Sequence, residues 1–296
     1  MCEVAVVTTG FFDGVHLGHR HVLETVVSSA RQRGEEAIVV SFWPHPRTVL
    51  QQDAREFRLL TSLEEKKALL LSCGIDRVEV LPFTREFSAL KAEEYLQLLQ
   101  ERYGASLVVM GYDNRIGSDK RTAQEICAIS PVPVVTVSPV ISSEAEGGVG
   151  KSPISSTKIR KALAEGDVEA ANAMLGYSYG LYGVVVAGNR MGRTIGFPTA
   201  NMQLYEPLKL VPGDGVYAVD VEVTGNVFKG MCNIGTRPTV GGTSRTIETH
   251  ILDFSEDIYG LPLRLRFLRR IRDERKFPSL DALRQQLELD ALNCKK

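Results

Sequence analysis

The sequence predicts an α/β protein in two parts: a parallel sheet with helices, followed by an antiparallel β-barrel and a C-terminal helix that begins after Ser279. Two observations carry this prediction. In the first part, short apolar runs alternate with helix-like segments, a pattern typical of right-handed βαβ units and of a sheet covered on both faces. In the second part, strand-like runs follow one another across short turns that leave no room for crossover helices.

In the first part, five apolar runs are expected to be strands and three periodic segments are expected to be helices. The expected strands are residues 4–8, 37–42, 77–81, 107–110 and 132–137, and the expected helices are residues 20–33, 63–73 and 91–103. Parallel sheets bind ligands at the carboxyl ends of their strands. The residues that follow these runs are therefore candidates for a site.

The boundary between the two parts is expected to follow a change in composition. Residues 142–153 are rich in Gly and Ser, as in a loop. Two helices come next, and the second is expected to end at Gly176. Valines then alternate with acidic residues in the run 215–223, as in a half-buried antiparallel strand. The expected domains are residues 1–177 and 178–296.

Composition limits the partners and the compartment. Lys plus Arg (35) nearly cancels Asp plus Glu (36), so no basic field is available to hold nucleic acid. The five cysteines are scattered without a CxxC pair, which argues against a disulfide framework and indicates a reducing compartment. No secretory signal or membrane helix is expected. The chain is predicted to be cytoplasmic, and its sequence sets no oligomeric state.

The segment GFFDGVHLGH follows the first expected strand and opens the first helix. Backbone N–H groups at such a helix start can hold an anion, and Gly10, Gly14 and Gly18 let the backbone approach a phosphate closely. His16 and His19 are neighbours on a helix and could donate hydrogen bonds to that phosphate. A phosphate site is favoured over a plain turn with two surface histidines, and over a metal site, for which further ligands are lacking.

The segment ISSTKIR looks like a second helix start that faces an anion. Ser155 or Ser156 can cap this helix, while Thr157 and Arg160 share one of its faces. Ile159 and Leu163 are expected on its buried side. A capped amphipathic helix with Arg160 in solvent would explain the same residues.

These two segments together resemble the HxGH nucleotidyltransferase superfamily, and more fully its bacterial flavin branch, the bifunctional riboflavin kinase/FMN adenylyltransferase (FAD synthetase) family. The resemblance extends from Gly10 to about Asp290. It implies a Rossmann-like domain in which FMN attacks the α-phosphorus of ATP, a reaction carried by positioning and charge stabilisation. The implied catalytic residues are His16 and His19. The implied ATP- and phosphate-binding residues are Gly10, Phe12, Asp13, Gly14, Gly18, Asp113, Ser156, Thr157 and Arg160.

One loop departs from the family pattern. After the fourth expected strand the family has Gly-x-Asp/Asn-Phe-x-Phe-Gly, whereas this chain reads GYDNRIG. Gly111, Asp113 and Gly117 are kept, while Asn114 and Ile116 replace the two aromatic residues. The departure concerns the contacts of this loop with the nucleotide or the flavin. It does not concern the residues that hold the phosphates, so adenylyl transfer is expected to be retained.

The string GNRMGRTIGFPTAN, residues 188–201, is the most specific in the chain. Its glycines and arginines suit a loop that folds over phosphates, although a glycine-rich hairpin linker has a similar composition. Thr199 and Asn201 offer the hard oxygens that Mg²⁺ prefers. By resemblance this is the riboflavin kinase motif, with PTAN as its magnesium and nucleotide element. The implied ATP and flavin contacts are Gly188, Arg193, Gly196, Pro198, Thr199, Asn201, Asn233, Arg272 and Glu274.

Glu248 lies in TIETHILDF, an expected strand on which Glu248, His250 and Leu252 point one way and the intervening residues the other. A carboxylate on the ligand face could accept the proton of a hydroxyl that attacks the γ-phosphate. An exposed strand glutamate without a role is the alternative. The family assigns its base to the glutamate of this segment, so the resemblance implies Glu248 as the base and His250 as a neighbour.

The expected function is therefore a pair of reactions that use ATP and Mg²⁺. The barrel would phosphorylate riboflavin to FMN, and the N-terminal domain would convert FMN to FAD with release of pyrophosphate. Two alternatives stay open: a riboflavin kinase with an inactive N-terminal domain, and a non-catalytic flavin-binding regulatory module. Intact His16, His19, Thr199, Asn201 and Glu248 favour catalysis, because binding alone requires no base.

Overall fold

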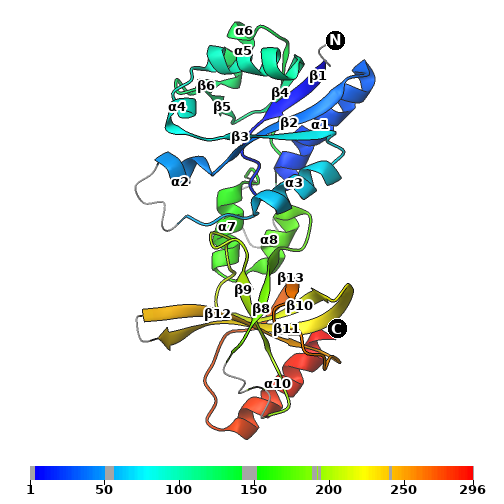
Figure 1. Ribbon diagram of the computed structural model, residues 1–296, viewed down its shortest axis with the longest axis vertical. Helices are drawn as coiled ribbons and strands as arrows, with labels where there is room; N and C mark the ends of the chain where they lie inside the picture. Colours follow the sequence, from blue (N-terminus) through cyan, green and yellow to red (C-terminus); the bar gives the residue numbers. More distant parts are fainter. Residues whose placement is uncertain are drawn as a thin grey trace. The chain divides into compact units, whose positions relative to one another are not determined.

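The structure is a computed structural model that describes residues 4–50, 57–141, 152–188, 192, 195–239 and 242–295. The chain forms two compact units, Met1–Ser156 and Thr157–Lys296, and each is described by itself (Figure 1). Two sequence predictions lie outside the described residues: Arg193, and most of the Gly- and Ser-rich stretch at residues 142–153. Within the described part of the chain, no helix has the length and apolar character needed to cross a membrane.

The first unit is built on a five-stranded sheet with the order β3-β2-β1-β4-β7. Its strands are β1 (Ala5–Thr9), β2 (Glu36–Trp43), β3 (Arg77–Pro82), β4 (Ala105–Gly111) and β7 (Val134–Val137). All neighbouring strands run parallel, which confirms the predicted sheet. The strand order reverses at β1, whose neighbours are β2 and β4, and ligands bind at the carboxyl ends of strands at such a reversal.

Helices cover both faces of this sheet. They are α1 (Leu17–Arg33), α2 (Pro46–Leu50), α3 (Leu63–Ser72), α4 (Arg85–Ser88), α5 (Ala92–Tyr103) and α6 (Ala123–Ile129). Consecutive residues of β1 face opposite sides, so Val6 packs with Leu23 of α1, whereas Val7 packs with Leu96 of α5. The first helix begins at the histidine segment, which places that segment at the carboxyl end of β1.

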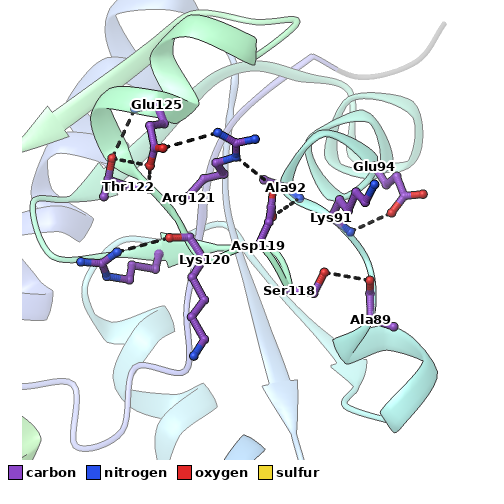
Figure 2. Close-up of polar contacts among 11 residues, drawn as sticks. Ala89, Lys91, Ala92, Glu94, Ser118, Asp119, Lys120, Arg121, Thr122 and Glu125 are labelled. Atoms are coloured by element: carbon purple, nitrogen blue, oxygen red, sulfur yellow. Dashed lines mark hydrogen bonds and ion pairs between the residues drawn. The ribbon is translucent and has the colours of Figure 1, made fainter.

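The loop that departs from the family pattern forms a small hairpin that was not predicted, because strands of two residues carry no periodic signal. Its strands are β5 (Arg115–Ile116) and β6 (Arg121–Thr122). Figure 2 shows how polar contacts attach it to residues 89–92, which lead from α4 into α5. The backbone N–H of Ala92 donates to Asp119 at 3.0 Å, and the Ser118 hydroxyl donates to the carbonyl of Ala89 at 2.9 Å. The hairpin is thus fixed to the first unit.

The second unit contains a closed barrel with the strand order β10-β11-β12-β9-β8-β13. Its strands are β8 (Gly180–Val186), β9 (Ala200–Leu204), β10 (Gly215–Val223), β11 (Asn226–Thr239), β12 (Gly242–Ile251) and β13 (Pro262–Arg272). Neighbouring strands run antiparallel, which confirms the predicted barrel. On β10, buried Val219, Val221 and Val223 alternate with half-buried Asp220 and Glu222, as the sequence predicts.

Among the described residues, the helices that accompany the barrel are α7 (Ser156–Ala164), which lies in the second unit from Thr157 onward, α8 (Val168–Leu175) and α10 (Leu280–Cys294). Both predicted helix ends are confirmed: α8 is capped by Gly176 with a φ of 75°, and the side chain of Ser279 accepts a hydrogen bond from the N–H of Ala282 at the start of α10. Helix α10 packs on β10 and β11. The compact units divide after Ser156, and the functional bounds 1–177 and 178–296 stay a prediction.

Candidate functional sites

The histidine turn, which we define as residues 10–19, connects β1 to α1. His16 is the N-cap of α1, and its Nδ1 accepts a hydrogen bond from the backbone N–H of His19 at 3.3 Å. Because Nδ1 accepts, the proton of the neutral His16 ring lies on Nε2. The two imidazole rings are stacked, with centroids 3.6 Å apart and an angle of 16° between their planes. The structure therefore brings the two predicted histidines together as one pair.

His19 lies in surroundings that keep its ring neutral. Its Nδ1 is buried and has no hydrogen-bond partner among the described residues. Burial is the largest cause that lowers the pKa of His19 well below its ordinary value, followed by the His16 ring and the Lys66 ammonium. A bound polyphosphate would oppose these effects, because a nearby negative charge favours the protonated imidazole.

Positive φ angles and two closely packed glycines shape this turn. Phe12 and Gly14 have φ angles of 53° and 83°, and Phe12, a residue only 5% exposed, is held in this uncommon conformation by the structure around it. A Cβ on Gly10 would lie 3.2 Å from the Phe12 ring, and a Cβ on Gly18 would lie 3.2 Å from the His16 ring. Glycine at these two positions therefore lets both rings lie against the turn.

Asp13 is turned into the protein. Its carboxylate accepts hydrogen bonds from the backbone N–H groups of Leu60 and Thr61, each at 3.0 Å, and from the Thr61 hydroxyl at 3.1 Å. The Thr61 hydroxyl in turn accepts from the N–H of Gly14 at 3.1 Å. The Ser156 hydroxyl donates to the carbonyl of Asp13 at 3.0 Å. Asp13 and Ser156 thus hold the turn in shape through these contacts.

The predicted anion contacts Thr157 and Arg160 lie on α7. From Thr157 onward this helix belongs to the second unit. Ile159 and Leu163 form its buried face, as predicted. A joint role of Thr157 and Arg160 with the histidine turn stays a prediction.

The loop GYDNRIG offers no aromatic face at either changed position. Ile116 is 5% exposed and packs in the core of the sheet. The side-chain amide of Asn114 donates to the carbonyl of the last residue of β1 at 3.4 Å. Gly117 has a φ of 79°, and a Cβ there would lie 2.2 Å from the nitrogen of Ala92, so this position needs glycine. Asp113 is exposed.

In the barrel, strand register aligns the predicted site residues in one row. Asn201 of β9 pairs with Glu248 of β12, and Glu248 pairs with Asn233 of β11. The row continues through Val216 of β10 to Arg272 of β13. Side chains at paired positions point to the same face of a sheet. Residues that are distant in sequence therefore share one face, and we call this set the barrel row.

Glu248 lies on the outer face of the barrel. On β12, Ile247, Thr249 and Ile251 are buried, whereas Glu248 and His250 are half-buried, which confirms the predicted alternation. The outer face borders a cavity of about 490 Å³, which we call the α10 cavity. Its lining includes Asn233, Glu248, Arg272, Glu274, Phe277 and Leu283.

A second cavity of about 310 Å³ lies at the glycine-rich segment, and we call it the glycine cavity. Gly188, Pro198, Thr199 and Asn201 line one side of it, and residues 254–259 line the other. Thr199 lines both cavities, so the contents of the two would meet there. A Cβ on Gly188 would lie 2.1 Å from the Asn201 side-chain nitrogen, so only glycine allows this approach.

Two further contacts fix the walls of the α10 cavity. His250 shares a hydrogen bond of 2.8 Å between its Nδ1 and the carbonyl of Pro198, and burial is the main cause that lowers the pKa of its ring. This contact fits the role of a neighbour that the sequence suggested. A Cβ on Gly235 would lie 2.2 Å from the Glu274 carboxylate, so Glu274 lies directly against β11. Gly196 has a φ of 84°, a conformation that favours glycine.

Sequence analysis missed residues that support both sites. Asp290 is fully buried on α10, accepts a hydrogen bond from Arg272 Nε at 2.9 Å and forms an ion pair with Arg272 Nη2 at 2.8 Å, which holds the guanidinium in the row. At the histidine turn, Thr61 and the buried Lys66 were missed. Ser62 and Glu65 form a capping box that begins α3, and this local signal marks the segment that carries both residues.

The fold and the two sites define the class of this protein. Two features are suited to phosphate chemistry: the histidine turn at the end of a parallel strand, and the glycine-rich segment beside a strand carboxylate. The chain therefore belongs to the class of enzymes that transfer phosphate-containing groups, with one site in each unit. Family models match both parts: FAD synthetase over residues 2–156 and riboflavin kinase over residues 175–296. The chain belongs to the bifunctional riboflavin kinase/FMN adenylyltransferase family.

Relatives with that name align with nearly the whole chain. The protein from Bacillus subtilis (strain 168) is 34% identical over 299 residues, which cover 97% of this chain and 90% of the relative. The protein from Escherichia coli (strain K12) is 37% identical over 297 residues, which cover 99% and 92%. A crystal structure described as a macrolide-efflux protein from Streptococcus pneumoniae has a TM-score of 0.92 and 35% identity, and the match covers 100% of this chain and 95% of that one. The resemblance seen in the motifs is confirmed.

Proposed function

We propose that the chain makes FMN and then FAD, one reaction at each site. The barrel transfers the γ-phosphate of ATP to the ribityl hydroxyl of riboflavin, which gives FMN and ADP. The site at the histidine turn transfers the AMP moiety of ATP to FMN, which gives FAD and pyrophosphate. The observation that carries this proposal is that the histidine pair and the barrel row are both complete in a chain of this family.

In the barrel, the two cavities suit the two substrates of the kinase reaction. The α10 cavity has an apolar wall that includes Phe277 and Leu283, which suits the flat flavin ring. The glycine cavity holds Gly188 and Thr199, which suit a polyphosphate. Since Thr199 lines both, the flavin hydroxyl and the γ-phosphate would meet beside it.

Glu248 is the proposed base of this reaction. Its carboxylate borders the α10 cavity and is paired in register with Asn201, a residue of the glycine cavity. It can therefore accept the proton of a riboflavin hydroxyl as that hydroxyl attacks the phosphorus. Arg272, fixed by Asp290, supplies a positive charge in the same cavity.

Magnesium is proposed as the cofactor, with Thr199 and Asn201 as its protein ligands. Both residues line the glycine cavity and carry oxygen donors, and Mg²⁺ is commonly held by one or two side chains together with substrate phosphates and water. The ion would neutralise charge on the phosphates of ATP. The tight approach of Gly188 to the Asn201 side chain fits a phosphate chain lying over the segment.

At the histidine turn, the N-terminus of α1 and the histidine pair are proposed to hold the ATP phosphates. The N-terminus of a helix attracts phosphate, and His16 and His19 can each donate a ring N–H. Thr157 and Arg160 are proposed to add contacts to the same phosphates. The reaction needs no covalent enzyme intermediate, so alignment of FMN with ATP and stabilisation of charge are the main contributions of the protein.

The proposal extends to the setting of the enzyme. We infer a cytoplasmic protein whose partners are riboflavin, FMN and ATP, with functional bounds at residues 1–177 and 178–296. The scattered cysteines and the near balance of charge support this setting.

A time course with purified protein tests both reactions. Riboflavin, ATP and Mg²⁺ are supplied, and the flavins are separated at intervals. FMN should appear first and FAD later, and a chelator should stop both steps. FMN that accumulates without FAD would favour a kinase with an inactive first unit. Unchanged riboflavin would favour a non-catalytic flavin-binding module.

A further inference from the structure

Lys66 is a buried lysine that reaches the histidine turn from α3. Lys66 is only 1% exposed. Its Nζ donates hydrogen bonds to the carbonyl oxygens of Phe11 at 3.1 Å and Phe42 at 3.4 Å, and lies 3.8 Å from the centroid of the Phe11 ring. Phe11 follows β1 and Phe42 is near the end of β2. One ammonium group thus joins the carboxyl ends of two neighbouring parallel strands.

A charge in this position is costly for the folded state. Taking an ammonium group out of water disfavours its charged form. Burial accordingly lowers the pKa of Lys66 to about 8, while the Asp13 carboxylate acts in the opposite direction. A methionine could occupy a similar volume without this cost. We therefore expect Lys66 to have a role other than filling the core.

The segment around Lys66 holds the histidine turn at two places, and we call residues 60–66 the α3 brace. At one place, the N–H groups of Leu60 and Thr61 bind the carboxylate of Asp13. At the other, Lys66 binds the carbonyl of Phe11. The capping box that begins α3 lies between these places and fixes the start of the helix, while the two carbonyl contacts hold the ammonium.

We propose that Lys66 is a positioning residue for adenylyl transfer, holding the carbonyls of Phe11 and Phe42 inward and adding a fixed positive charge below the histidine turn. With these carbonyls turned inward, their negative ends point away from the ATP phosphates. The charge acts at short range through protein, where salt screens it little. Because Lys66 is buried, we assign it a positioning role and not direct contact with the substrate. This inference rests on the proposed FAD-forming reaction at the turn.

The test compares Lys66→Met, Lys66→Arg and the control Lys67→Met, which makes the same change at the next residue of α3. FAD formation from FMN is measured over a range of ATP concentrations. Lys66→Met should raise the KM for ATP about tenfold and lower kcat less, as expected for loss of one fixed charge near a polyphosphate. Lys66→Arg keeps the charge and should stay within about threefold of the wild type. Lys67→Met should match the wild type.

Two internal checks separate a positioning role from general damage. FMN formation from riboflavin in the same samples should be unchanged in all variants, because it takes place at the barrel. Trp43 is the only tryptophan of the chain and lies on β2, so its fluorescence follows unfolding of the first unit. If Lys66→Met does not fold, Lys66→Arg decides: a folded arginine variant with a normal KM for ATP supports the proposal.

Three results would overturn the proposal. A KM for ATP in Lys66→Met equal to that of the wild type would leave Lys66 without a role. An equal defect in folded Lys66→Met and Lys66→Arg would exclude the charge. A wild-type chain that makes FMN but no FAD would overturn the adenylyl-transfer function and this inference together. Failure of the proposed function is thus seen in the wild type, whereas failure of the role of Lys66 is seen only in the variants.

Discussion

The histidine turn and the barrel row handle the same kind of group, yet they are held in place in different ways. The turn is a continuous stretch of chain, and its shape depends on another segment, chiefly on the side chains of Thr61 and Lys66. The row takes one residue from each of five strands, and backbone pairing sets the positions of these residues, with Asp290 of α10 holding the Arg272 guanidinium. A substitution in the row should therefore change mainly the chemistry of that site. A substitution in the turn should change both its chemistry and its geometry.

The largest expected effect is at Glu248. Changing Glu248→Gln removes the base while the backbone pairing that places residue 248 remains, so FMN formation from riboflavin should fall about 10²- to 10⁴-fold. FAD formation from supplied FMN should continue. The control is Glu222→Gln, which changes a barrel carboxylate that pairs with Arg266 instead. If Glu248→Gln makes FMN at the normal rate, Glu248 is not the base.

A somewhat smaller effect is expected at the histidine pair. The double change of His16→Ala and His19→Ala should lower FAD formation from FMN about 10²- to 10³-fold, because two donors to the developing phosphate charge are lost. FMN formation should stay normal. His21→Ala changes an exposed histidine on the same helix and should behave as the wild type. A fall in both reactions of the double variant would contradict the separation of the two sites.

The smallest effect concerns pH and the stability of the first unit. The pKa of Lys66 is lowered from 10.5 to about 8, so between these values the unfolded chain binds more protons than the folded one. The free energy of unfolding should therefore rise with pH in this window, by about 2 kcal/mol between about pH 7.5 and about pH 9.5 relative to Lys66→Met. Denaturant titrations followed by Trp43 fluorescence measure it. Parallel pH curves for the two proteins would show that Lys66 is not the cause.

The sequence determined the kinds of elements and the chemistry available at each site. Alternation in residues 215–223, the glycine that ends α8 and the serine that begins α10 are local signals, and the structure confirms all three. The same holds for the parallel sheet and the barrel. Local patterns succeed here because backbone conformation and the burial of one face depend mainly on residues within a few positions of one another.

Only the tertiary structure decided which distant groups meet. The inward turn of Asp13 toward Leu60, the reach of Lys66 to two strand ends and the pairing of Arg272 with Asp290 leave no periodic trace in the sequence. The barrel row likewise depends on the register of five strands. Such contacts follow from how separate segments pack, because a hydrogen bond depends on positions in space and not on spacing along the chain.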